Sequence, residues 1–233
     1  SQASEPQRDM DPGPDPGPNQ YDDDLDSAFT ESEVRQAVFA QKNSKSPGMD
    51  LLIAEIFKHS FDIISPFLIQ FYNKIFSEGT YPQSWGEGII IPLFKGGNHE
   101  AKNFRGITLN NIISKIYSKL LVTRMTKWAE LDDKFIDNQY GFQKGKSTVD
   151  CIFILHALIS KTLANKKKLY VAFLDWEKMF DSIDRLYLWQ KLLNENISTK
   201  FINAIKSMYS VVKSIIRYKN SKSEFINSNI GVK

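Results

Sequence analysis

The sequence predicts a large α+β domain, for three reasons. Segments with the apolar period of a helix and segments with the composition of a strand both occur, and they do not follow the regular repeat of a parallel α/β protein. Hydrophobic residues make up 42% and charged residues 24% of the 233 residues, as in folded domains that bury a core. The single cysteine, Cys151, excludes a disulfide scaffold, and three scattered histidines leave no structural zinc site.

Residues 1–26 are predicted to be a disordered linker. They carry eight acidic residues against one basic residue and hold five of the nine prolines, a composition that cannot bury enough apolar surface to fold. The linker therefore has a net charge of −7, and residues 27–233 have a net charge of +10. A basic body of this kind suggests a polyanionic partner, and ordinary lysine-rich solvation of the surface explains the same charge equally well.

The predicted helices follow from caps and apolar periods. Thr30 and Glu33 form a capping box in front of a short amphipathic helix, which ends at the turn Ser46–Asp50. Helix-period segments then follow at about 51–59, 61–78, 110–130, 148–164, 184–195 and 198–210.

The predicted strands are five short segments. Residues 89–94 form a β-branched strand, residues 95–98 turn it, and residues 103–109 return as the second arm of a hairpin. Residues 169–174 are nearly all apolar, as expected for a strand buried on both faces. Residues 212–218 and 224–230 have the pattern of a second hairpin.

Asp175 is the residue whose position points most directly to chemistry, because it follows the predicted buried strand at once. A rigid scaffold presents a metal ligand at such a place. A carboxylate there can hold Mg²⁺, which suits phosphoryl or nucleotidyl transfer. The alternative is that Asp175 only caps the turn after the strand.

Six segments together resemble, in order, the motifs of the reverse transcriptase of non-LTR (LINE-type, Jockey-like) retrotransposons. The resemblance covers about residues 28–233 and implies a right-hand polymerase fold, with fingers at about 27–165 and the start of the palm at about 166–233. The segments are an N-terminal extension motif at 45–50, two fingers motifs at 85–95 and 103–109, the segment 138–148, palm motif A at 173–181 and the opening of motif B at 229–233.

The resemblance implies roles for single residues around the reacting nucleotide. Asp175 would be the motif A metal ligand, with the backbone carbonyl of Trp176 beside it on the same ion. Phe180 would be a steric gate whose rigid ring excludes a ribose 2′-hydroxyl. Arg105 would reach the incoming triphosphate, and Lys95 would add a second positive charge there.

The loop 139–148 would hold the template strand. Its backbone N–H groups and lysines suit phosphate oxygens, and Phe142 is expected to pack beneath. The residues expected to contact the template are Gly141, Lys144, Gly145, Lys146 and Ser147.

The function that the resemblance implies is RNA-directed DNA synthesis. The cofactor would be Mg²⁺, with Mn²⁺ as a possible substitute, and the partners would be an RNA template, a DNA primer and deoxynucleoside triphosphates, with no membrane involved. Proteins of this kind act inside the cell, in the cytoplasm and the nucleus. The oligomeric state stays open.

The family motifs also define what these 233 residues lack. Motif B continues beyond the position of Lys233, and the paired catalytic aspartates of motif C come later still. One carboxylate cannot position two Mg²⁺ ions. We therefore expect a fingers and partial palm fragment, truncated before motifs B and C, that is inactive in isolation.

Two alternative functions come from other classes. The first is a P-loop NTPase, because residues 141–147 fall one residue short of its phosphate-binding loop. The polar segment before them lacks the strand that such a loop requires, which argues against this function. A non-catalytic nucleic-acid-binding remnant, or a domesticated fragment, would show the same salt-sensitive binding through its basic body.

Overall fold

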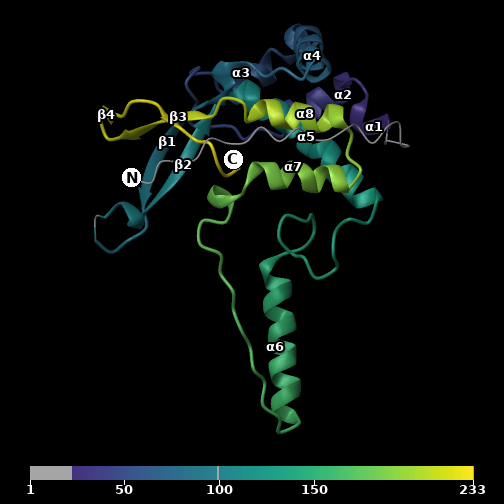
Figure 1. The fold of residues 1–233 in the computed structure, drawn as a ribbon, viewed down its shortest axis with the longest axis vertical. Coiled ribbons are helices and arrows are strands. Elements are labelled where there is room, and N and C mark those ends of the chain that lie inside the picture. Colours follow the sequence, from purple (N-terminus) through teal and green to yellow (C-terminus); the bar gives the residue numbers. More distant parts are fainter. Residues whose placement is uncertain (1–22, 99, 233) are drawn as a thin grey trace. The chain divides into compact units, whose positions relative to one another are not determined.

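The structure is a computed structural model that describes residues 23–98 and 100–232, in two compact units (Figure 1). The first unit comprises the described residues up to Met125 and those from Phe180 onward, and the second comprises Thr126–Met179. The predicted boundary between fingers and palm, near residue 165, therefore falls inside the second unit. Within the described ranges, no helix combines the length and apolar composition needed to cross a membrane.

Most helices of the first unit lie close to their predicted positions, but the helix after the capping box ends at Phe39, before the predicted end at the turn Ser46–Asp50. The capping box is confirmed, since the Glu33 N–H donates to the Thr30 hydroxyl (3.3 Å) and the Thr30 N–H donates to the Glu33 carboxylate (2.9 Å). The helices are α1 (Asp23–Asp26), α2 (Glu31–Phe39), α3 (Ala54–His59), α4 (Phe61–Glu78), α7 (Arg185–Asn194) and α8 (Thr199–Met208), and α5 (Ile112–Leu131) continues into the second unit.

The predicted linker is wrong in its last four residues. Residues 23–26 form α1, the side chain of Leu25 is buried, and the Ser198 hydroxyl donates to the Asp26 carboxylate (2.5 Å). The local composition could not indicate this contact, because Ser198 lies 172 residues away in the sequence. The prediction for residues 1–22 lies outside the described residues.

Aromatic side chains form the centre of the core. Tyr72 from α4 and Tyr117 from α5 stack with ring centroids 5.8 Å apart, and each lies 6.3 Å from the Trp85 ring. Burial raises the pKa of the Tyr72 and Tyr117 hydroxyls well above the ordinary value, and it raises the pKa of Tyr81 to about 12. These phenols therefore stay neutral at any physiological pH and act as packing groups.

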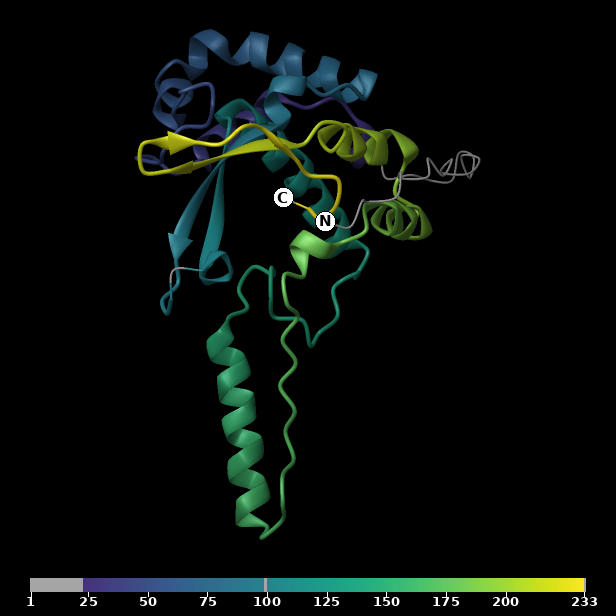
Figure 2. The same ribbon diagram turned by 60° about the vertical axis from the view of Figure 1, so that its left-hand side comes forward.

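A small mixed sheet lies beside these helices, and Figure 2 shows its β1–β2 hairpin projecting from them. β1 (Glu87–Phe94) pairs antiparallel with β2 (Phe104–Asn110), which confirms the first predicted hairpin. β3 (Lys213–Tyr218) pairs antiparallel with β4 (Ser221–Lys222) and with β5 (Ile226–Asn227), which confirms the second hairpin in part. The short 3₁₀ helices are η1 (Gln83–Gly86), η2 (Ala101–Asn103) and η3 (Phe180–Ser182).

The sequence did not predict that β1 and β3 pair in parallel, with Ile89 beside Ile215. The pairing begins next to Gly86, where an added Cβ would lie 1.8 Å from the Val211 carbonyl oxygen. Only glycine allows these two segments of the chain to approach so closely at this point. The sheet therefore joins two hairpins that are more than a hundred residues apart in the sequence.

The second unit consists of α6 (Thr148–Ala164) and the chain on either side of it. After α6 the chain runs back along the helix in both views (Figures 1 and 2). The prediction of a buried strand at residues 169–174 is wrong. The segment does not form a strand, and the side chains of Phe173 and Leu174 are 82% and 85% exposed. An apolar composition cannot make a strand by itself, because the N–H and C=O groups of a strand need a second strand to pair with.

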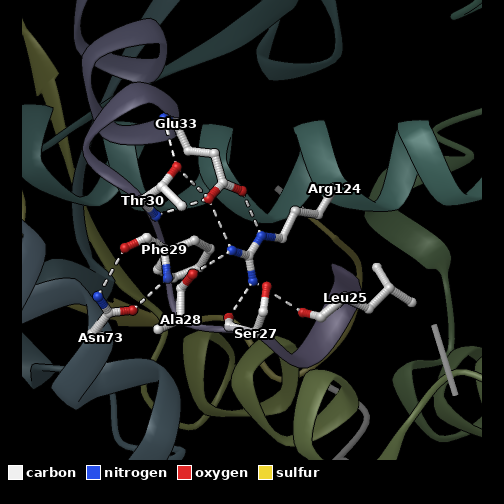
Figure 3. Close-up of polar contacts among 8 residues, drawn as sticks. All are labelled: Leu25, Ser27, Ala28, Phe29, Thr30, Glu33, Asn73 and Arg124. Carbon is white, nitrogen blue, oxygen red and sulfur yellow. Dashed lines mark hydrogen bonds and ion pairs between the residues drawn. The ribbon is translucent and has the colours of Figure 1, made fainter. Parts of the chain in front are cut away.

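Arg124 on α5 fixes the segment before α2 (Figure 3). Its side chain is 6% exposed, and its guanidinium group makes two bonds to the Glu33 carboxylate, of 2.7 and 3.0 Å. The guanidinium carbon lies 4.2 Å from the centre of the Phe29 ring. The remaining N–H groups donate to the backbone carbonyls of Leu25, Ser27 and Ala28.

Acidification is expected to destabilise the first unit through Glu33. Burial alone raises the pKa of this carboxyl group, but the hydrogen bonds from Arg124 and Thr30 and the Arg124 charge hold its pKa below the ordinary 4.5. This stabilisation is complete above about pH 4.5 and is lost as the pH falls through the lower pKa of the folded state. Urea unfolding from neutral to acidic pH should show the loss, and a Glu33→Gln variant with an equally steep pH dependence would contradict it.

Candidate functional site

Two of the predicted phosphate-binding cations lie together near the tip of the β1–β2 hairpin. Arg105 on β2 is paired with Leu93 on β1, and Lys95 follows β1 directly, its N–H donating to the Asn103 carbonyl (2.8 Å). Both side chains are exposed, and neither forms an ion pair with a carboxylate of the described residues. A guanidinium fork and an ammonium group so placed can bind phosphate oxygens.

The hairpin geometry follows from its sequence. Gly96 and Gly97 adopt positive φ angles of 116° and 87°, which residues with a side chain rarely reach. They lie in the connection between β1 and β2, which also contains η2 and joins strands paired up to Phe94 and Phe104. The two cations therefore lie at the loop end of the hairpin.

Asp175 and Trp176 belong to the second unit, and the structure places neither of them on a strand. Both side chains are exposed. The rigid strand that was expected to present the Asp175 carboxylate is absent from the described residues. The carboxylate is accessible, and its setting is an extended segment of chain.

Phe180 is the first residue of η3, in the first unit, and its side chain is 47% exposed. Its backbone carbonyl accepts a hydrogen bond from the Val232 N–H (2.8 Å). The predicted gate residue is thus fixed at its backbone by the segment that resembles the opening of motif B.

The predicted template loop leads into α6 in the second unit. Ser147 caps the helix in a capping box, with its N–H and hydroxyl both bonded to the Asp150 carboxylate (2.7 and 3.0 Å). Lys146 donates to the Asp137 carbonyl (2.8 Å), and its ammonium group lies 5.3 Å from the centre of the Tyr140 ring. The Ser147 hydroxyl and the Lys146 ammonium therefore already have partners within the second unit.

The other three residues predicted to contact the template, Gly141, Lys144 and Gly145, are open to solvent. Lys144 is exposed, and an added Cβ at Gly141 or Gly145 would meet no atom within 4 Å. The expectation for Phe142 is wrong: the side chain is 88% exposed, at a φ of 64°, and so does not pack beneath the loop.

A second buried arginine, Arg185, was not predicted. It is 7% exposed and donates to the carbonyls of Ser228, Ile230 and Gly231, directly before Val232. Burial lowers its pKa from the usual value. Nothing in the local sequence distinguishes it from an exposed arginine at the start of a helix, since these three carbonyls lie more than forty residues away.

The described residues do not complete a two-metal site. They contain no group of three or more histidine, cysteine, aspartate or glutamate side chains that could hold a metal ion. Asp175 offers one exposed carboxylate, whereas two hard cations need several oxygen ligands in near-octahedral positions. Asp175 is therefore the side chain among the described residues that fits a ligand position of such a site.

Comparison with known proteins gives consistent matches. A model of the family "Reverse transcriptase (RNA-dependent DNA polymerase)" matches residues 95–232, which is more than half of the chain. The chain is 28% identical over 196 residues to a transposon TX1 uncharacterized 149 kDa protein of Xenopus laevis, covering 83% of this chain and 15% of that protein.

Two similar proteins come from Drosophila melanogaster. The probable RNA-directed DNA polymerase from transposon X-element is 25% identical over 209 residues, covering 88% of this chain and 23% of that protein. The RNA-directed DNA polymerase from mobile element jockey is 25% identical over 159 residues, covering 67% of this chain and 17% of that protein. The chain thus spans a quarter or less of the length of these relatives.

Proposed function

The chain belongs to the reverse transcriptase family, and from this premise we propose that it forms part of the RNA-directed DNA polymerase of a non-LTR retrotransposon. One observation carries the proposal: the family match over residues 95–232 includes Lys95, Arg105, Asp175, Phe180 and the loop 141–147. The mixed helix and strand content fits a polymerase fold. Within that fold we assign residues 27–165 to the fingers and residues from 166 onward to the palm.

The β1–β2 hairpin tip binds the incoming nucleotide in this proposal. Arg105 and Lys95 are exposed and close in the hairpin register, as side chains that contact a mobile triphosphate need to be. The loop holds the template through Lys144 and the open backbone at Gly141 and Gly145. Ser147 and Lys146 stabilise this loop through hydrogen bonds to the Asp150 carboxylate and the Asp137 carbonyl.

Asp175 and the Trp176 carbonyl are the proposed ligands on this chain for a divalent metal ion, Mg²⁺ or Mn²⁺. Such an ion, when bound, stabilises charge on the oxygens that react during nucleotidyl transfer. The Asp175 side chain is exposed, so its carboxylate is accessible to a metal ion. The other ligands of a two-metal site are not supplied by the described residues.

Primer extension tests the proposed function. The complete polymerase that carries this domain should extend a DNA primer on an RNA template with deoxynucleotides. The 233-residue chain by itself should bind primer–template in a salt-dependent way and give no extension above a control without protein. Binding without extension in both proteins would favour the non-catalytic alternative, and extension by the chain alone would overturn the expectation of inactivity.

Replacing Phe180 by valine should admit ribonucleotides. The smaller side chain removes the ring that is proposed to clash with a 2′-hydroxyl, so the preference for deoxyribonucleotides should fall about tenfold or more, or about 1.4 kcal/mol. Single-nucleotide incorporation by the complete polymerase measures this preference. Phe225, which is also 47% exposed in the first unit, is a matched control; Phe225→Val should leave the preference unchanged. Unchanged selectivity in Phe180→Val would argue against the gate.

A further inference from the structure

Arg185 holds the segment 228–232 by its backbone. Its Nε donates to the Gly231 carbonyl (2.8 Å), and its Nη2 donates to the carbonyls of Ser228 (2.9 Å) and Ile230 (3.2 Å). Its Nη1 reaches the Tyr209 carbonyl (3.5 Å), and its guanidinium carbon lies 4.9 Å from the centre of the Tyr209 ring. One side chain therefore fixes three carbonyl groups within four residues of chain.

The same segment is bonded to the backbone of the gate residue. The Val232 N–H donates to the Phe180 carbonyl (2.8 Å), and the Gly231 N–H donates to the Ile183 carbonyl (2.9 Å). Gly231 has a φ of 79°, and an added Cβ would lie 2.6 Å from the Asp181 carbonyl oxygen. The segment thus lies directly against η3, at a distance that only glycine permits.

The bonding pattern requires a guanidinium group. A planar fork can serve several carbonyls in fixed directions, whereas an ammonium group is a point charge on a flexible stem. A neutral replacement removes the charged donor of these carbonyls. The position of the segment 228–232 should therefore depend on the shape of the side chain as well as on its charge.

We propose that Arg185 is a positioning residue for sugar selection: it fixes the segment 228–232 against η3 and so holds Phe180 in the position from which its ring excludes a ribose. The inference rests on the proposed function, because it assigns a task to the gate of that polymerase. Arg185 itself acts only through the backbone of residues 228–232, which contacts Phe180.

Amide hydrogen exchange in the 233-residue chain tests the anchoring. In Arg185→Lys and Arg185→Gln, exchange at Gly231 and Val232 should accelerate at least about tenfold, because local opening of this segment becomes easier. Arg124→Lys is the matched control, since Arg124 is equally buried in the same unit and bonds a different segment. The control should lower global stability and leave the relative protection of residues 228–232 unchanged. Unaltered exchange at Gly231 and Val232 in both Arg185 variants would overturn the inference.

Sugar selectivity of the complete polymerase tests the consequence. The ratio of kcat/KM for a deoxynucleotide to that for the matching ribonucleotide should fall at least about fivefold in Arg185→Lys, and should stay unchanged in Arg124→Lys.

If Phe180→Val relaxes selectivity and Arg185→Lys does not, the inference is wrong and the proposed gate survives. If Phe180→Val leaves selectivity unchanged, the gate fails and the link from Arg185 to sugar selection fails with it. If no variant or parent extends a primer, the proposed function fails, and the exchange experiment still decides the anchoring.

Discussion

Replacing Asp175 by asparagine should abolish primer extension by the complete polymerase while leaving its affinity for primer–template unchanged. Asparagine keeps the size of the side chain and removes the negative charge through which the carboxylate attracts a divalent cation. The stabilisation that a bound metal gives to reacting oxygens amounts to several kcal/mol, so the rate should fall about a thousandfold or more. Single-turnover extension and equilibrium binding measure the two quantities separately.

Glu177 provides the control for this experiment. It lies two residues from Asp175 in the same exposed segment, so Glu177→Gln makes the same chemical change without touching the proposed ligand. Its extension rate should stay within about twofold of the parent rate, which corresponds to less than about 0.5 kcal/mol. Retained extension in Asp175→Asn would mean that the motif A assignment is wrong, and equal losses in both variants would point to the charge of the whole segment.

Replacing Arg124 by alanine should lower the free energy of unfolding of the 233-residue chain by about 3 kcal/mol or more. The change removes a buried ion pair partner and leaves backbone carbonyls at the start of the domain without donors. It also removes the cation from the face of the Phe29 ring. Urea denaturation followed by tryptophan fluorescence measures the loss, since Trp85 lies in the same core.

Lys119 on the same helix is the matched control for Arg124. It is exposed, so Lys119→Ala should change the unfolding free energy by no more than about 0.5 kcal/mol. A loss below about 1 kcal/mol in Arg124→Ala would show that the segment before α2 contributes little to stability.

The local elements of the fold could be predicted from the sequence. The capping box at Thr30 and Glu33 identifies the start of α2, and the glycine turn after Phe94 identifies the first hairpin, because both signals lie within a few residues. The contacts of Arg124 and Arg185 could not be predicted. Their partners lie more than twenty residues away, and no short-range pattern separates a buried arginine from an exposed one.

The apolar segment 169–174 shows a different limit. Its composition indicated a buried strand, and composition reports only how a segment would behave if a partner strand were present. The residues of the candidate site could be proposed from the sequence for another reason. Asp175, Phe180 and Arg105 were identified by resemblance of whole motifs in a fixed order, which carries information that periodicity and charge do not contain.

The parallel pairing of β1 with β3 has a consequence for synthesis on the ribosome. About 125 residues separate Glu87 from its partner Lys213, and at a translation rate of 5–20 residues per second this amounts to roughly 6–25 s. During that interval β1 can close its hairpin with β2, and its other edge waits for chain that has not yet been made. A nascent-chain chaperone, or fast elongation through this window, would protect that edge from pairing with another polypeptide.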